Sequence, residues 1–235
     1  MIFLLTLIAA DVNFIAVDVH TRHVVERQWA DAEQPAPVGS LVKPFVALAY
    51  GGEFPSLVCK GSADRCWLAR GHGKLEFRQA LAESCNAYFL NLARGVDRAT
   101  LAVTAAKFGI PPPSDDSPEA RIGLGTAWRI SPLALVRAYA ELASRAGEPR
   151  VDEILAGLRM AAESGTAKAL GPGVLAKTGT AACVAERRDA GDGFAVVLEP
   201  AEQPRIALLV RVHGAPGASA AKSAARILRR IRIGD

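Results

Sequence analysis

A serine and a lysine stand one helical turn apart near the start of the chain. Ser40 and Lys43 lie in the stretch "PVGSLVKPFVALAY", where an apolar run predicts a helix. At this spacing both side chains project from the same helix face. A serine hydroxyl becomes a nucleophile when a base lies within hydrogen-bond reach, and a buried lysine with a lowered pKa can be that base. The structural alternatives are a helix N-cap for Ser40 and a surface-reaching lysine stem for Lys43.

Two further short motifs follow, Ser84-Cys85-Asn86 and Lys177-Thr178-Gly179-Thr180. Each motif is weak alone, because short patterns of common residues arise by chance. The chain even holds a second Ser-x-x-Lys match, from Ser219 to Lys222, but it follows the third motif and cannot complete the set. The order of the three motifs, on a helix start, in a helical region and on a strand, carries the weight.

Acyl transfer explains why three such motifs would converge. A second cation, Lys177, would lower the pKa of Lys43 and attract a substrate carboxylate. Ser84 would pass a proton toward a leaving amine, and the Asn86 amide would fix the substrate and orient Lys43.

The third motif would also bind substrate through its backbone. We expect Thr178, Gly179 and Thr180 to line the substrate site together with Lys177. A backbone N–H from the Thr180 strand and the N–H of Ser40 would form an oxyanion hole.

The elements that must position these residues can be read from periodicity. Two β-type runs around "HTRH" predict an N-terminal hairpin, and three short strand-like runs lie between residues 174 and 214. Residues 74–147 are mostly helical, "EFRQALAESCNAYFLNLARGV" among them, another helix lies near 151–163, and a last helix begins at about 217. The order predicts an α+β fold: an antiparallel sheet of about five strands, flanked by helices.

The same order predicts how the chain divides. We expect residues 1–10 to be the remnant of a signal peptide and residues 11–235 to form a single domain. Its sheet lobe would comprise 11–50 and 150–235, and an inserted all-helical lobe would comprise 51–149. The protein is accordingly expected to be exported to the periplasm or cell envelope.

Composition limits the partners. Of 235 residues, 50% are hydrophobic and 22% are charged, which indicates a globular domain, and the formal charge of +4 is mild. Basic residues are scattered and aromatic residues make up only 6%, which disfavours a nucleic-acid partner.

Cysteines offer two interpretations. Cys59 and Cys66 flank the polar loop "CKGSADRC", and in an exported protein they predict a local disulfide. A metal site of Cys59, Cys66 and His72 is the alternative, but it lacks an evident fourth ligand, so no metal is expected. Cys85 and Cys183 lie in apolar contexts that are typical of inert core thiols.

Taken together, the motifs resemble those of the penicillin-binding proteins and the related serine β-lactamases. "PVGSLVKPFVALAY" resembles their active-serine helix, "SCNAYF" the second motif, and "SGTAKALGPGVLAKTGTA" the run that ends in the third; the resemblance extends over about residues 13–232. It implies a β-lactamase/transpeptidase-like fold with no cofactor. It also implies a serine acyltransferase, either a transpeptidase or a DD-carboxypeptidase, that acts on D-Ala-D-Ala stem peptides of peptidoglycan through a Ser40 acyl-enzyme.

Two alternatives stay open. A class D-like β-lactamase would also use these motifs, although Asn86 stands where that class has valine, and no Glu-x-x-Leu-Asn pattern for a class A enzyme is present. The small size, and the lack in this sequence of the family's usual N-terminal pedestal, suggest a non-catalytic sensor or scaffold that binds β-lactams or muropeptides. The expected partners are stem peptides, β-lactams and cell-envelope proteins; the oligomeric state is open.

Overall fold

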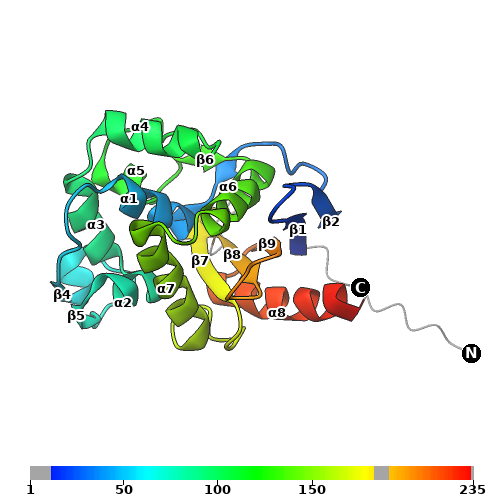
Figure 1. The fold of residues 1–235 in the computed structure, drawn as a ribbon. Helices are drawn as coiled ribbons and strands as arrows, with labels where there is room; N and C mark the ends of the chain where they lie inside the picture. The colour runs from blue at the N-terminus through cyan, green and yellow to red at the C-terminus, as the bar shows by residue number, and fades with distance from the viewer. Residues whose placement is uncertain (1–11, 183–190, 234–235) are drawn as a thin grey trace, which may run out of the picture.

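Five antiparallel strands form the central sheet of the computed structural model, which describes residues 12–182 and 191–233 (Figure 1). Their order across the sheet is β2-β1-β9-β8-β7. The strands are β1 (Val12–Asp18), β2 (Val24–Gln28), β7 (Leu175–Ala181), β8 (Asp192–Glu199) and β9 (Ile206–Val212). The first and last strands of the chain, β1 and β9, pair with each other. The proposed signal-peptide remnant and Cys183 lie outside the described residues.

Both faces of this sheet are buried. Successive side chains of a strand point to opposite faces, and in β1 Phe14 and Ala16 enter one core while Ile15 and Val17 enter the other. The central strands are therefore almost continuously apolar. The runs that form β8 and β9 had been predicted as strands.

Helices cover the two faces (Figure 1). The C-terminal helix α8 (Gly217–Ile233) packs on β7, β8 and β9 through alanines of its apolar side. On the opposite face α6 (Pro132–Ser144) packs on β1, β8 and β9, and α7 (Pro149–Glu163) lies against β7. The predicted helices near 151–163 and from about 217 are thus confirmed.

Between the first motif, Ser40 to Lys43, and α6 the chain forms a second lobe. It is mainly helical, but the prediction of an all-helical lobe is wrong in detail, because β4 and β5 form a hairpin there and β6 pairs with β3. Its helices are α2 (Phe77–Ala82), α3 (Asn86–Arg94), α4 (Arg98–Lys107) and α5 (Pro118–Arg121). Its short strands are β4 (Leu57–Cys59), β5 (Gly73–Leu75) and β6 (Arg129–Ile130), with β3 (Ala36–Pro37) reaching in from the sheet side; the single turn η2 (Gly61–Asp64) follows β4.

A break at Ser84 divides what the sequence pattern presents as one helix. The apolar spacing of "EFRQALAESCNAYFLNLARGV" continues through the break, but α2 ends at Ala82 and α3 begins only at Asn86. Ser84 has φ +52°, in the left-handed region, where an L-residue is rare. Periodicity could not reveal this turn because the residues on each side keep helical spacing.

Among the described helices, none combines the length and the apolar character needed to span a bilayer.

Candidate active site

Ser40 lies in a single 3₁₀ turn, η1 (Gly39–Val42), directly before helix α1 (Lys43–Ala49). Neither helix start shows a side-chain cap, so the N-cap interpretation of Ser40 is wrong. The Ser40 side chain is half-buried, and its hydroxyl makes no hydrogen bond to the part of the chain that the structure describes. The hydroxyl is therefore available to a substrate.

Backbone contacts fix the position of this turn against the third motif. Gly39 has φ +59°, and a Cβ there would lie 2.4 Å from the carbonyl oxygen of Thr180, so only glycine fits. The buried Tyr139 hydroxyl donates a hydrogen bond of 2.7 Å to the carbonyl of Leu41. The serine turn thus sits between β7 and α6.

The Lys43 amine is fully buried, which excludes the surface-reaching interpretation. Its Nζ donates to the Ser84 carbonyl at 2.8 Å and to Asn86 Oδ1 at 2.7 Å, with a longer contact of 3.3 Å to Ser84 Oγ. The first and second motifs therefore meet, and Asn86 accepts a hydrogen bond from Lys43.

Lys177, also fully buried, approaches the same serine from strand β7. Its Nζ donates to Ser84 Oγ at 2.8 Å and to the carbonyl of Thr178 at 2.7 Å. The Ser84 hydroxyl thus lies between Lys43 and Lys177, and the left-handed conformation of Ser84 places it there. All three motifs converge on this one oxygen.

Two buried amines around one hydroxyl cannot both keep a proton at low cost. Burial lowers the pKa of Lys43 to about 7, against a smaller opposing effect of the nearby thiols of Cys85 and Cys66. Burial, and then the charge of Lys43, lower the pKa of Lys177 well below its ordinary value. The pair therefore holds about one proton near neutral pH, so one amine is neutral and can accept a proton while the other remains a cation.

The remaining residues of the third motif anchor β7 to its surroundings. Thr178 Oγ1 donates to Thr166 Oγ1 at 2.6 Å, and Thr166 Oγ1 in turn donates to the carbonyl of Ala82 at the end of α2. Gly179 lies against the carbonyl of Val38, and the exposed Thr180 accepts a hydrogen bond from the N–H of Gly217. Thr166 was not predicted as a site residue; its place in the "SGTAK" run was the only sequence signal.

The predicted disulfide between Cys59 and Cys66 is wrong for this structure, where both residues are buried free thiols. His72 Nδ1 lies 3.6 Å from Cys59 Sγ and 3.5 Å from Cys66 Sγ, so it sits between them. Cys85, interpreted from the sequence as an inert core thiol, joins the group at 3.8 Å from Cys66 Sγ. A fourth side chain with metal-binding chemistry, which the sequence did not reveal, thus lies inside the second motif.

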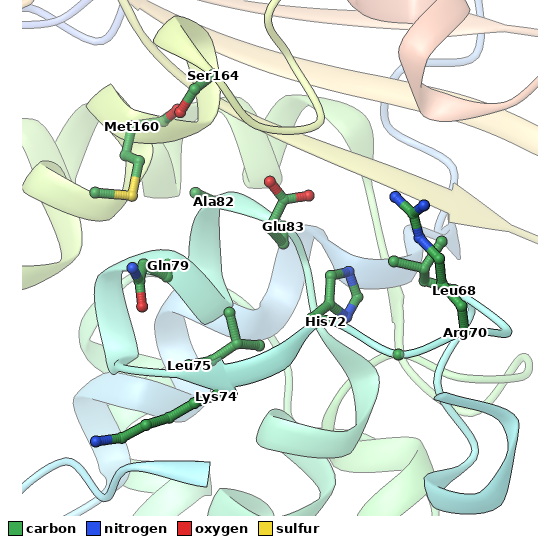
Figure 2. A pocket seen from close by; sticks show the side chains of 11 residues that line it. Leu68, Arg70, His72, Lys74, Leu75, Gln79, Ala82, Glu83, Met160 and Ser164 are labelled. Atoms are coloured by element: carbon green, nitrogen blue, oxygen red, sulfur yellow. The ribbon is translucent and has the colours of Figure 1, made fainter. Parts of the chain in front are cut away.

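A cavity of about 570 Å³ opens beside this cysteine and histidine group (Figure 2). His72 and Glu83 line it from one side, and Met160 of α7 and Ser164, directly after α7, line it from the other. Neither Ser40 nor any lysine of the three motifs borders it, so the cavity is separate from the catalytic groups.

Comparison with known proteins agrees with the fold and the motifs. The structure matches the penicillin-binding protein PBP2 of Pseudomonas aeruginosa with a TM-score of 0.78 at 19% identity, covering 94% of this chain and 70% of that one. It matches PBP2 of Helicobacter pylori, solved with MreC, with a TM-score of 0.81 at 14% identity, covering 94% and 60%. It matches the transpeptidase domain of Burkholderia pseudomallei penicillin-binding protein 3 with a TM-score of 0.72 at 19% identity, covering 95% of this chain and 89% of that one.

A search of curated protein sequences found no relative of this chain. The model of the penicillin binding protein transpeptidase domain matches residues 60–232, a range that contains the second and third motifs and begins after the first. The structure connects the first motif to this range, because Lys43 donates hydrogen bonds to Ser84 and Asn86. By its sequence match and its fold, the chain belongs to the penicillin-binding protein transpeptidase domain family.

Proposed function

We propose that the protein is a serine acyltransferase that acts on the D-Ala-D-Ala end of peptidoglycan stem peptides through an acyl-enzyme on Ser40. The observation that carries this proposal is the Ser84 hydroxyl held by both Lys43 and Lys177. That arrangement offers a base beside the nucleophilic turn, a relay hydroxyl and a cation, which are the groups that acyl transfer to and from a serine requires.

In the acylation step, neutral Lys43 takes the proton of Ser40 while the Ser40 oxygen attacks the carbonyl of the penultimate D-alanine. The C–N bond to the terminal D-alanine then breaks. The proton reaches the leaving amine through Ser84, whose hydroxyl contacts both lysines. The product amine departs and the peptide remains as an ester on Ser40.

Substrate binding in this proposal falls to the third motif. Protonated Lys177 attracts the terminal carboxylate of the peptide or the carboxylate of a β-lactam. The N–H groups of Ser40 and Thr180 stabilise the developing oxyanion, a role favoured by the close approach of Gly39 to the Thr180 backbone. Thr178 and Gly179 keep β7 in place beside the serine turn.

The fate of the acyl-enzyme separates the candidate activities. An amine acceptor gives cross-linking, water gives DD-carboxypeptidase activity, and rapid hydrolysis of β-lactams gives a β-lactamase. The Lys43 amine donates to three oxygens of the second motif, a polar surrounding that disfavours the lysine modification of class D β-lactamases. We therefore favour slow deacylation of β-lactams and place the activity in peptidoglycan synthesis outside the cytoplasm.

Labelling with a fluorescent penicillin, followed by intact-mass analysis and peptide mapping, tests the proposal. One adduct per chain on Ser40, stable over many minutes, is the expected result. The matched control is Ser219→Ala, which removes the serine of the second Ser-x-x-Lys match and should leave labelling unchanged. An adduct that persists in Ser40→Ala contradicts the assignment of the nucleophile. Rapid loss of the adduct favours the β-lactamase, and a stable adduct without turnover of D-Ala-D-Ala peptides favours the sensor.

A further inference from the structure

Four side chains with metal-binding chemistry converge beside the second motif, outside the catalytic groups described above. The ligand atoms of Cys59, Cys66, His72 and Cys85 all lie within 4.8 Å of one another. They come from separate segments, with Cys59 at the end of β4, Cys66 after η2, His72 before β5 and Cys85 between α2 and α3. Convergence from four segments is typical of a metal centre that closes a loop.

We propose that these four residues bind one structural Zn²⁺ ion, which holds the second catalytic motif in place.

The spacing of the ligand atoms is that of a zinc tetrahedron. With Zn–S bonds of about 2.3 Å and a Zn–N bond of about 2.0–2.1 Å, the edges of an ideal tetrahedron are about 3.8 Å between sulfurs and about 3.5–3.6 Å between sulfur and nitrogen. The corresponding separations here are 3.8 Å from Cys66 to Cys85, and 3.5 and 3.6 Å from the sulfurs of Cys66 and Cys59 to His72 Nδ1. These three of the six separations match a zinc tetrahedron and all six lie within 4.8 Å, so a zinc ion fits with at most small shifts of the ligand side chains.

The ligand set and its burial favour zinc in a structural role. Three thiolates and one imidazole are a set that tetrahedral zinc sites use, and soft sulfur ligands disfavour Mg²⁺ and Ca²⁺. All three cysteines are buried, and four protein ligands leave no open position for water. Binding releases the three thiol protons, so the loaded site carries one net negative charge.

Local backbone geometry shapes the loop around the proposed site. Gly71, directly before His72, has φ +78°, and a Cβ there would lie 2.3 Å from the carbonyl oxygen of Cys59. Any residue larger than glycine at position 71 would clash with the Cys59 backbone and disturb the group.

The position of Cys85 gives the proposed ion a consequence for the catalytic groups. Its neighbours on either side, Ser84 and Asn86, both contact Lys43, and Ser84 keeps a left-handed conformation there. A left-handed non-glycine residue is strained, and it persists only where the surrounding structure holds it. A metal bond at Cys85 would tie this short turn to the β4–β5 hairpin and so maintain its shape.

The test uses the full chain, purified under reducing conditions without chelator. Mass spectrometry of the metal content should find about one zinc per chain, and a zinc chelator should lower the melting temperature. Replacement by Co²⁺ should give thiolate-to-cobalt charge-transfer absorption and the visible bands of a tetrahedral ion. In the loaded protein, the three ligand thiols should resist alkylation until zinc is removed, whereas Cys183 should react equally with and without zinc.

Matched variants separate this site from other cysteines and histidines. Cys66→Ser and His72→Ala should lose most of the bound zinc, whereas Cys183→Ser and His20→Ala should retain it. The proposal is overturned if the wild-type chain, given excess Zn²⁺ under reducing conditions, binds none and shows no cobalt spectrum. It is equally overturned if the native protein proves to hold a Cys59–Cys66 disulfide. Because every readout is metal content, spectrum, alkylation or melting temperature, the outcome is independent of penicillin acylation.

Discussion

Removal of the Lys177 charge tests the two-lysine arrangement most directly. The nitrogens of Lys43 and Lys177 contact the same Ser84 oxygen, at 3.3 and 2.8 Å, so they lie no more than about 6 Å apart. With an effective dielectric constant of about 20, two like charges at that separation repel by about 3 kcal/mol. Lys177→Met keeps much of the stem volume and removes both this repulsion and the hydrogen bond to Ser84.

Two effects on acylation by benzylpenicillin follow. Loss of a charge-assisted contact to the substrate carboxylate costs about 1.5–3 kcal/mol, so the second-order acylation rate should fall at least about tenfold. Lys43, relieved of a neighbouring cation, should keep its proton to higher pH. In the wild type the rising limb of the pH–rate profile reports loss of the first of the pair's two protons, which the charge of the other lysine favours. In Lys177→Met only burial acts on Lys43, so the limb should move to higher pH, toward the Lys43 pKa of about 7.

Stopped-flow or gel-based acylation rates between pH 5 and 10 measure both effects. Lys222→Met is the matched control, because Lys222 is the exposed lysine of the second Ser-x-x-Lys match on α8. An unchanged rate and an unchanged profile in Lys177→Met would refute the role of Lys177. A lower rate with an unmoved profile would retain the carboxylate contact but refute the electrostatic effect on Lys43.

Two further predictions concern groups around the same site. Ser84→Ala removes the hydroxyl shared by the lysines and should slow acylation by about a hundredfold or more, since proton transfer by a positioned group contributes about 10²–10⁴-fold. Ser40 should stay the labelled residue. A rate within about threefold of wild type, measured by the same assay, would exclude the relay. Lys43 should make the free energy of unfolding rise between pH 7 and about 8.5, because the folded state binds fewer protons than the unfolded state, whose lysines titrate near 10.4. Urea titrations should show this rise with pH in wild type and a smaller rise in Lys43→Met. An equal rise in both proteins would contradict the lowered pKa of Lys43.

Much of the fold could be predicted because its signals are local and periodic. The apolar runs of β1, β8 and β9 identify strands whichever way the chain turns between them. The three motifs could be predicted to form one site from their order along the chain. Chance gives single matches to each motif, but it seldom gives all three in this order.

What the sequence could not provide is the path of the chain between α2 and α3. The left-handed Ser84 leaves no trace in the hydrophobic pattern, so the turn that presents its hydroxyl to both lysines went unpredicted. The same turn brings Cys85, thirteen residues beyond His72 in sequence, to the Cys59, Cys66 and His72 group. The sequence signal for this group was that three cysteines and a histidine lie between residues 59 and 85. Their number was a better guide than the apolar context of Cys85 alone.

Three consecutive residues thus face three different groups. Ser84 contacts both lysines, Cys85 joins the sulfur and imidazole group, and Asn86 accepts from Lys43 while beginning α3. A continuous helix would fix neighbouring side chains about 100° apart around one axis. Here the chain leaves the helix between Ala82 and Asn86, so the three side chains follow a different path. The left-handed residue changes the direction of the chain and makes the three contacts compatible. The strain at Ser84 is offset by contacts on both sides, from Lys43 and Lys177 on one and from the Cys85 turn on the other. A catalytic defect caused by a change at Cys59 or His72 would therefore act through the shape of this turn, although neither residue borders Ser40.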